Sequence, residues 1–108
     1  MLFVETSVFA RCVTELLDDD SYRGLQETLT GNPGIGAVIA GTSGLRKLRW
    51  KTGNQGKRGG LRLIYYWVAQ QNQIYMLYLY PKAAQEDLTT EQKKLLMQIV
   101  ERWTHEQS

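Results

Sequence analysis

The stretch at 45–68 constrains the fold most, because two strand-like segments flank a loop that cannot pack. Residues 45–51 alternate between apolar and basic side chains, which predicts a strand with one face for the core and one for anions. The basic members are Lys47, Arg49 and Lys51. Four glycines at 52–60 predict a basic loop that turns the chain back, and branched and aromatic residues at 61–68 predict a central strand with Arg62 at its start. The stretch therefore predicts an antiparallel hairpin.

The N-terminal part of the chain predicts a short strand followed by two helices. The apolar run at 1–5 predicts the strand, and Thr6 or Ser7 can cap a helix whose apolar residues recur from Val8 to Leu17. The acidic run at 18–21 offers side-chain acceptors for the exposed amides of a second helix. We read these aspartates as a cap and not as a metal site, which would need further converging oxygens.

The remaining elements follow from turn signals and periodicity. The connector at 35–44 is expected to be a loop with one brief strand near 37–40. A turn at 70–73 and a strand at 74–80 follow the hairpin, and a last amphipathic helix begins at 87–90. Its expected buried residues are Leu88, Leu95, Leu96, Ile99, Val100 and Trp103.

Length and composition favour one folded domain at 1–108, since 108 residues with 43% hydrophobic composition can bury a core. No apolar run approaches the roughly 20 residues that cross a bilayer, and no secretion signal is evident, so the expected compartment is the cytoplasm. Cys12 is the only cysteine, and a helix turns its basic neighbour Arg11 away from it. We expect Cys12 to be a small buried hydrophobe and not a catalytic thiol.

The net charge of +2 conceals an uneven distribution along the chain. Residues 28–85 carry eight bases and no acid, whereas 1–27 carry six acids and two bases and 86–108 carry five acids and three bases. A block this one-sided attracts polyanions, above all nucleic-acid phosphate. The alternative is a solvated charged face, but such faces normally mix both signs.

Conventional catalytic sets have little support in this sequence. His105 is the only histidine and lies near the C-terminus, which argues against a histidine-based triad or metal site. The glycines around Lys57 lack the P-loop spacing, because Arg58 stands where serine or threonine is required. The basic segment contains no carboxylate for paired-acid or two-metal hydrolysis.

Lysines, arginines and tyrosines remain, and such groups can cleave RNA without a metal. The ribose 2′-hydroxyl then attacks the adjacent phosphorus, and preorganised cations stabilise the charge that develops in the transition state. DNA lacks the 2′-hydroxyl and is inert to this chemistry. The tyrosines can be core, stacking platforms for bases, or both, and strand periodicity favours core for most. They are Tyr65, Tyr66, Tyr78 and Tyr80.

Three motifs together resemble the RelE superfamily of bacterial toxins, and most closely its HigB-type branch. They are G-L-R-K-L-R at 44–49, G-K-R-G-G-L-R-L-I-Y-Y at 56–66 and L-Y-L-Y-P-K at 77–82. The resemblance covers most of the chain, including two helices before the sheet. It implies an α+β fold in which a small twisted antiparallel sheet packs with two N-terminal helices and one C-terminal helix.

The resemblance also implies a function and partners. Relatives are toxins of type II toxin-antitoxin systems that cleave messenger RNA on the ribosome without a cofactor, and the partner is an antitoxin, in this branch commonly a HigA-like protein with a helix-turn-helix domain. The catalytic residues it suggests are Arg62, Lys82 and Lys57. The RNA-binding residues it suggests, together with the strand pattern, are Lys47, Arg49, Lys51, Arg58 and Arg46. No metal ligand is expected.

One departure from the family leaves the general base open. Some relatives carry a tyrosine or a histidine shortly after the last strand, and this chain has neither between Lys82 and Thr90. Two alternatives therefore stand beside the RNA-cleaving toxin: a non-catalytic nucleic-acid-binding module that uses the same cations, and a toxin homologue that has lost activity. The acidic N-terminal helices are a candidate surface for the antitoxin.

Overall fold

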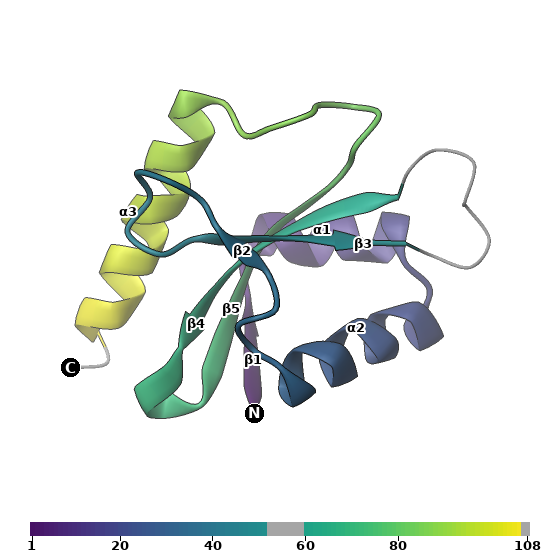
Figure 1. The fold of residues 1–108 in the computed structure, drawn as a ribbon, viewed down its shortest axis with the longest axis horizontal. Helices are drawn as coiled ribbons and strands as arrows, with labels where there is room; N and C mark the ends of the chain where they lie inside the picture. Colours follow the sequence, from purple (N-terminus) through teal and green to yellow (C-terminus); the bar gives the residue numbers. More distant parts are fainter. Residues whose placement is uncertain (52–59, 107–108) are drawn as a thin grey trace.

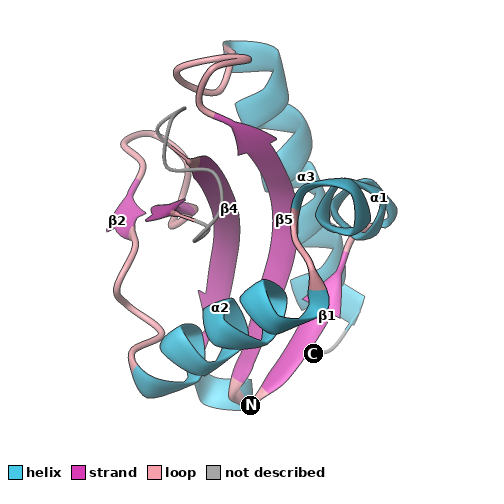
Figure 2. Cartoon of the chain, turned by 90° about the vertical axis from the view of Figure 1, so that its right-hand side faces the viewer, coloured by secondary structure: helices cyan, strands magenta, loops and turns pink. Residues whose placement is uncertain are grey.

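The computed structural model describes residues 1–51 and 60–106, and shows a five-stranded sheet between two helical layers (Figure 1). The strands lie in the order β1-β5-β4-β3-β2. Helices α1 and α2 cover one face, and α3 covers part of the other (Figure 2). The elements are β1 (Leu2–Glu5), α1 (Ser7–Leu16), α2 (Asp19–Gly31), β2 (Ala37–Val38), β3 (Arg46–Trp50), β4 (Leu61–Val68), the 3₁₀ turn η2 (Ala69–Gln71), β5 (Gln73–Pro81) and α3 (Thr90–Glu106).

The predicted hairpin is confirmed, because β3 and β4 pair antiparallel with Trp50 opposite Leu61. A second hairpin joins β4 to β5 through a turn that ends at Asn72, whose φ of 53° lies in the left-handed region that asparagine tolerates. The antiparallel arrangement holds for β2 to β5, whereas β1 pairs parallel with β5. The sheet is therefore mixed, because the first strand adds to its edge after a connection that spans most of the chain.

The first core layer lies between the sheet and helices α1 and α2. Phe9, Leu25 and Leu29 are fully buried against inward-facing residues of β4 and β5, such as Leu63 and Met76. These helices form because apolar residues recur at helical spacing and because polar residues cap their first turns. Cys12 is a free thiol and is half-buried against this layer, so the prediction that it is a small buried hydrophobe is only partly correct.

The second core layer lies beneath α3. Leu96 and Val100 belong to one buried cluster with Leu77 and Tyr75. The rings of Trp103 and Tyr75 lie edge to face, with their centroids 4.9 Å apart. A reciprocal cap starts the helix, since the backbone amide of Gln92 donates to Thr89 Oγ1 at 3.0 Å and the amide of Thr89 donates to Gln92 Oε1 at 2.9 Å.

The prediction that Leu95 is buried was wrong, because 58% of Leu95 is exposed. Helical spacing places it next to the buried stripe, but no described element covers it.

Thr6 ties the start of α1 to the sheet. Its Oγ1 accepts a bond from the Phe9 amide at 2.9 Å, which confirms the predicted cap, and it donates to the Leu77 carbonyl of β5 at 2.9 Å. The Thr6 amide also donates to the Met76 carbonyl at 3.1 Å. A buried hydroxyl thus fixes the direction in which the chain leaves β1.

We predict that Thr6→Ala lowers the free energy of unfolding by about 1–3 kcal/mol, because it removes a cap and leaves buried polar groups without a partner. Urea denaturation measures this change. The matched control is Thr14→Ala, which removes an exposed hydroxyl bonded to the Ala10 carbonyl and should stay within about 0.5 kcal/mol of wild type. Equal losses in the two variants would contradict a special role for Thr6.

Candidate functional site

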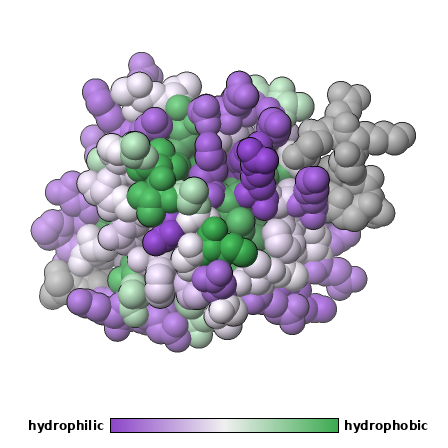
Figure 3. All heavy atoms as spheres, viewed as in Figure 1, coloured by the Kyte–Doolittle hydropathy of each residue, from purple (hydrophilic) through white to green (hydrophobic). Residues whose placement is uncertain are grey.

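Three side chains lie in one row across the sheet. Arg62 on β4 pairs in register with Arg49 on β3 and with Tyr80 on β5. Lys47 lies two residues before Arg49, and Tyr78 lies two residues before Tyr80. Lys47 and Tyr78 therefore point to the same face of the sheet as this row. Figure 3 shows hydrophilic side chains gathered over β3, between that strand and the segment leading to α3. The sheet thus presents cations and tyrosines side by side, on the part of this face that α3 leaves open.

Arg62 is buried, with 5% of its surface exposed, and it carries a charge that no described carboxylate neutralises at ion-pair distance. In the described part of the chain, its side chain makes one hydrogen bond, a weak one from Nη1 to the carbonyl of its neighbour Leu61 at 3.5 Å. The undescribed residues 52–59 contain no acid. A guanidinium stays charged in proteins and is costly to bury without an anion. The site therefore favours an anionic ligand.

Strand periodicity favours the core for most of the tyrosines and leaves both roles open, and the structure places Tyr80 both in the core and beside Arg62. Only 2% of it is exposed, and its hydroxyl has no hydrogen-bond partner among the described residues. Burial raises the pKa of Tyr80, and the negative charge of Asp87 adds to that effect while Arg62 opposes it. The phenol is therefore neutral at pH 7 and is able to donate a hydrogen bond. The sequence signal for its role is its register opposite Arg62, which needs the strand pairing to be known.

Lys47 forms an ion pair that the sequence did not predict. Its Nζ lies 2.8 Å from Oδ1 of Asp87, a residue of the segment between β5 and α3. The hydrogen bond and charge of Lys47 hold the pKa of Asp87 below its ordinary value of 3.8, and Arg62 contributes to the same shift. An acid therefore lies on the face of the sheet that carries Lys47, Arg49 and Arg62, which we call the cation face, although the sequence predicts only bases there.

The structure brings some of the other predicted residues close to this face. Arg49 and Lys51 are exposed, and Arg49 lies in the row described above. Lys82 is exposed just past β5, and its amide donates to the Gly60 carbonyl at 3.1 Å, which places it next to the start of β4. Lys57 and Arg58 lie outside the described residues.

Arg46 is separated from the other cations. It lies on the opposite face of β3, where its Nη1 donates to the Gly36 carbonyl at 2.7 Å and to the Gly34 carbonyl at 3.1 Å. These bonds hold the connector before β2, as does the Tyr65 hydroxyl, which donates to the Pro33 carbonyl at 2.8 Å. The position of Arg46 therefore speaks for a structural role and against the predicted contact with RNA.

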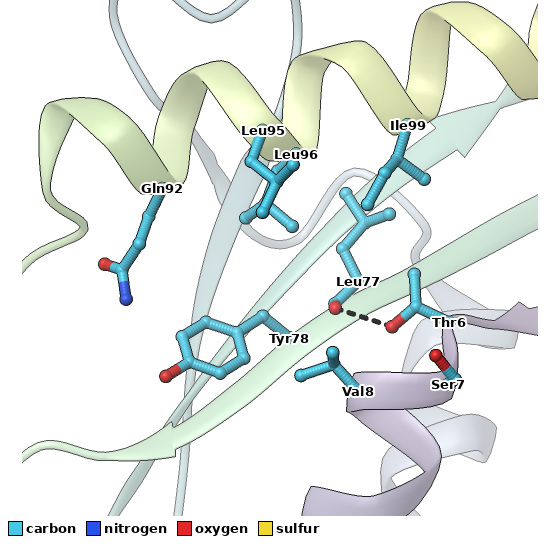
Figure 4. Close-up of a pocket in the computed structure, with 9 residues that line it drawn as sticks. All are labelled: Thr6, Ser7, Val8, Leu77, Tyr78, Gln92, Leu95, Leu96 and Ile99. Carbon is cyan, nitrogen blue, oxygen red and sulfur yellow. Dashed lines mark hydrogen bonds between the residues drawn. The ribbon is translucent and has the colours of Figure 1, made fainter.

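An apolar groove of about 290 Å³ lies next to the cation face, between the start of α1, β5 and α3 (Figure 4). Exposed Val8 and Leu95 border it, and Tyr78 connects it to the site, since the Tyr78 and Tyr80 ring centroids are 5.2 Å apart. The Gln92 amide at its border already bonds Gln85 and Thr89. None of the described residues that line the groove is a cation, so these residues do not offer a second phosphate site.

The structure resembles that of E. coli toxin RelE, determined in the free state for a double arginine-to-alanine mutant. The two superpose with a TM-score of 0.57 over 79% of this chain and 86% of the RelE chain, at 16% sequence identity. No protein-family model matches the sequence. The chain thus has a RelE-like α+β fold, as the sequence motifs predicted. Among the described residues, no helix has the length and apolar character needed to cross a membrane.

We predict that Arg62→Met raises the free energy of unfolding by about 1–3 kcal/mol, because it replaces an unpaired buried charge with an apolar chain of similar length. Urea denaturation measures this change as well. Arg49→Met is the matched control, since Arg49 is exposed and its loss should change stability by less than about 0.5 kcal/mol. A marked loss of stability in Arg62→Met would instead make Arg62 a structural residue.

Proposed function

We propose that this protein is an RNA-cleaving toxin of a type II toxin-antitoxin system, of the HigB-type branch, which cuts messenger RNA on the ribosome. The observation that carries the proposal is the charge of buried Arg62, which no described carboxylate neutralises at ion-pair distance and which lies in a row with Arg49 and Tyr80. Proteins rarely bury an unpaired charge without a use for it, and such groups concentrate at functional sites. The RelE-like fold supports the same proposal as an analogy of fold.

In the proposed reaction the RNA supplies its own nucleophile. The 2′-oxygen attacks the adjacent phosphorus while the bond from phosphorus to the 5′-oxygen breaks, which leaves a 2′,3′-cyclic phosphate and a 5′-hydroxyl. Arg62 stabilises the negative charge that grows on the phosphoryl oxygens, and Tyr80 donates a hydrogen bond beside it. Lys47 and Arg49 hold neighbouring phosphates.

The two proton transfers are assigned to lysines. One proton leaves the 2′-hydroxyl and one reaches the departing 5′-oxygen. Lys82 lies next to the start of β4 and is our candidate within the described chain, and Lys57 is the second candidate. Neutral Tyr80 does not fit the role of base.

The proposal includes partners that the resemblance suggests. They are the ribosome with its messenger RNA and a HigA-like antitoxin with a helix-turn-helix domain, and the cytoplasm is where these would meet. A non-catalytic binding module, or an inactive homologue, would use the same cations only to grip phosphate. Cleavage assays with purified protein separate these functions.

We predict that Arg62→Ala lowers cleavage of messenger RNA on programmed ribosomes by a factor of about 10² or more, because it removes the main stabiliser of transition-state charge. Primer extension maps the new 5′ ends, and inducible expression in a bacterium should show growth arrest for wild type but not for Arg62→Ala. Arg102→Ala is the matched control, since this exposed arginine lies near the far end of α3 and should leave cleavage unchanged. Full cleavage by Arg62→Ala would reject the assigned role, and no cleavage by wild type would favour the binding module.

We also predict that Tyr80→Phe slows cleavage severalfold without loss of stability. The Tyr80 hydroxyl has no partner among the described residues, so its removal breaks no bond in the folded protein but removes the proposed bond to the substrate. Tyr75→Phe is an unusually close control: its hydroxyl is also buried without a described partner, but it lies under α3 beside Trp103. Single-turnover cleavage and thermal unfolding of both variants make the test. Equal rates for the two variants would remove Tyr80 from the site.

A further inference from the structure

The segment between β5 and α3 is fixed in place at several points. Leu88 is buried in the same cluster as Tyr80, with 8% of it exposed. Gln85 Nε2 donates to the Asp87 carbonyl at 2.9 Å and to Gln92 Oε1 at 2.9 Å, and Gln92 belongs to the cap of α3. Asp87 is therefore held by its own backbone and by its neighbours, and does not rest on one exposed ion pair alone.

The carboxylate of Asp87 lies against the cation face at Lys47. It contacts Lys47 at 2.8 Å, and its charge also acts on Arg62, on Tyr80 and on Lys93 of α3. Asp87 and its neighbour Glu86 are the first acids after the acid-free stretch at 28–85. Among the described residues, Asp87 is the only acid in an ion pair with a basic residue of that stretch.

We infer that Asp87 is an internal substitute for a substrate phosphate: it occupies Lys47 when the site is empty, and RNA must displace it to bind. This inference rests on the proposed function and adds a control over the same site. The Asp87 carboxylate and a phosphate oxygen compete for the ammonium group of Lys47, so RNA can contact Lys47 only after the Lys47–Asp87 ion pair breaks.

Competition of this kind selects for ligands with several phosphates. A lone phosphate gains one contact and must break one, whereas an RNA strand gains further contacts at Arg49 and Arg62 in the same row. Release of Asp87 also leaves a carboxylate that attracts a cation from solution. The net release of ions on binding is then smaller than for a site without Asp87.

The test compares Asp87→Asn with wild type for binding to a single-stranded RNA whose 2′-hydroxyls are methylated, so that no cleavage occurs. Fluorescence anisotropy at several salt concentrations should show about two- to fivefold tighter binding by Asp87→Asn at low salt, since exposed ion pairs have strengths of that order. The plot of log affinity against log salt should be steeper for the variant, and its advantage should shrink as salt rises.

Glu86→Gln is the matched control, because it removes the same charge from the next residue. Equal tightening by Asp87→Asn and Glu86→Gln would overturn the inference in favour of a general charge effect, and weaker binding by Asp87→Asn would overturn it in favour of Asp87 as a support for Lys47. In a Lys47→Ala background, Asp87→Asn should lose most of its effect.

Binding of inorganic pyrophosphate, followed by NMR at the lysine side-chain amines, separates this inference from the proposed function. If no variant binds RNA but Asp87→Asn binds pyrophosphate more tightly than Glu86→Gln does, the RNA proposal fails and the role of Asp87 stands. If no variant binds RNA and pyrophosphate binds the two variants equally or binds neither, the inference fails together with the proposed function.

Discussion

The register of three neighbouring strands decides where the cations of this protein meet. Arg49, Arg62 and Tyr80 share one row because β3, β4 and β5 pair without a shift up to Ile64, where a bulge follows. The apolar residues of the opposite face hold this register, since a slip by one residue would send Leu63 and Leu79 to the wrong side of the sheet. The core on one face thus positions the charges on the other.

The same arrangement sets stability against function. The buried guanidinium of Arg62 has no described carboxylate at ion-pair distance, and the buried hydroxyl of Tyr80 has no described hydrogen-bond partner. Both groups therefore lower the stability of the isolated protein. The helical layers supply the apolar burial that tolerates this cost. Sites of this kind gain most from a ligand, because binding satisfies groups that the fold leaves unsatisfied.

The sequence predicted the parts of the fold that depend on local pattern. The β3–β4 hairpin, the caps at Thr6 and Asp18, and the buried stripe of α3 apart from Leu95 follow from periodicity and side-chain chemistry. The parallel pairing of β1 with β5 was not predicted, because it joins distant segments and leaves no short-range signal. The pairing of Arg62 with Arg49 follows from the register of the β3–β4 hairpin alone. The positions of Arg46, Tyr80 and Asp87 depend on contacts between different elements, and the periodicity of the sequence does not predict such contacts.

The parallel pairing of β1 with β5 also bears on how the chain folds. The bond from Thr6 to Leu77 joins residues 71 apart, and such long-range contacts slow folding because the intervening chain must be ordered first. During synthesis, the edge strand and the first turn of α1 have no sheet to join until β5 has left the ribosome. Asp87 follows β5 and emerges still later. A chain that stops before β5 therefore lacks both the edge contact and part of the candidate site, and all the described residues of the site are present only once the chain has been made as far as Asp87.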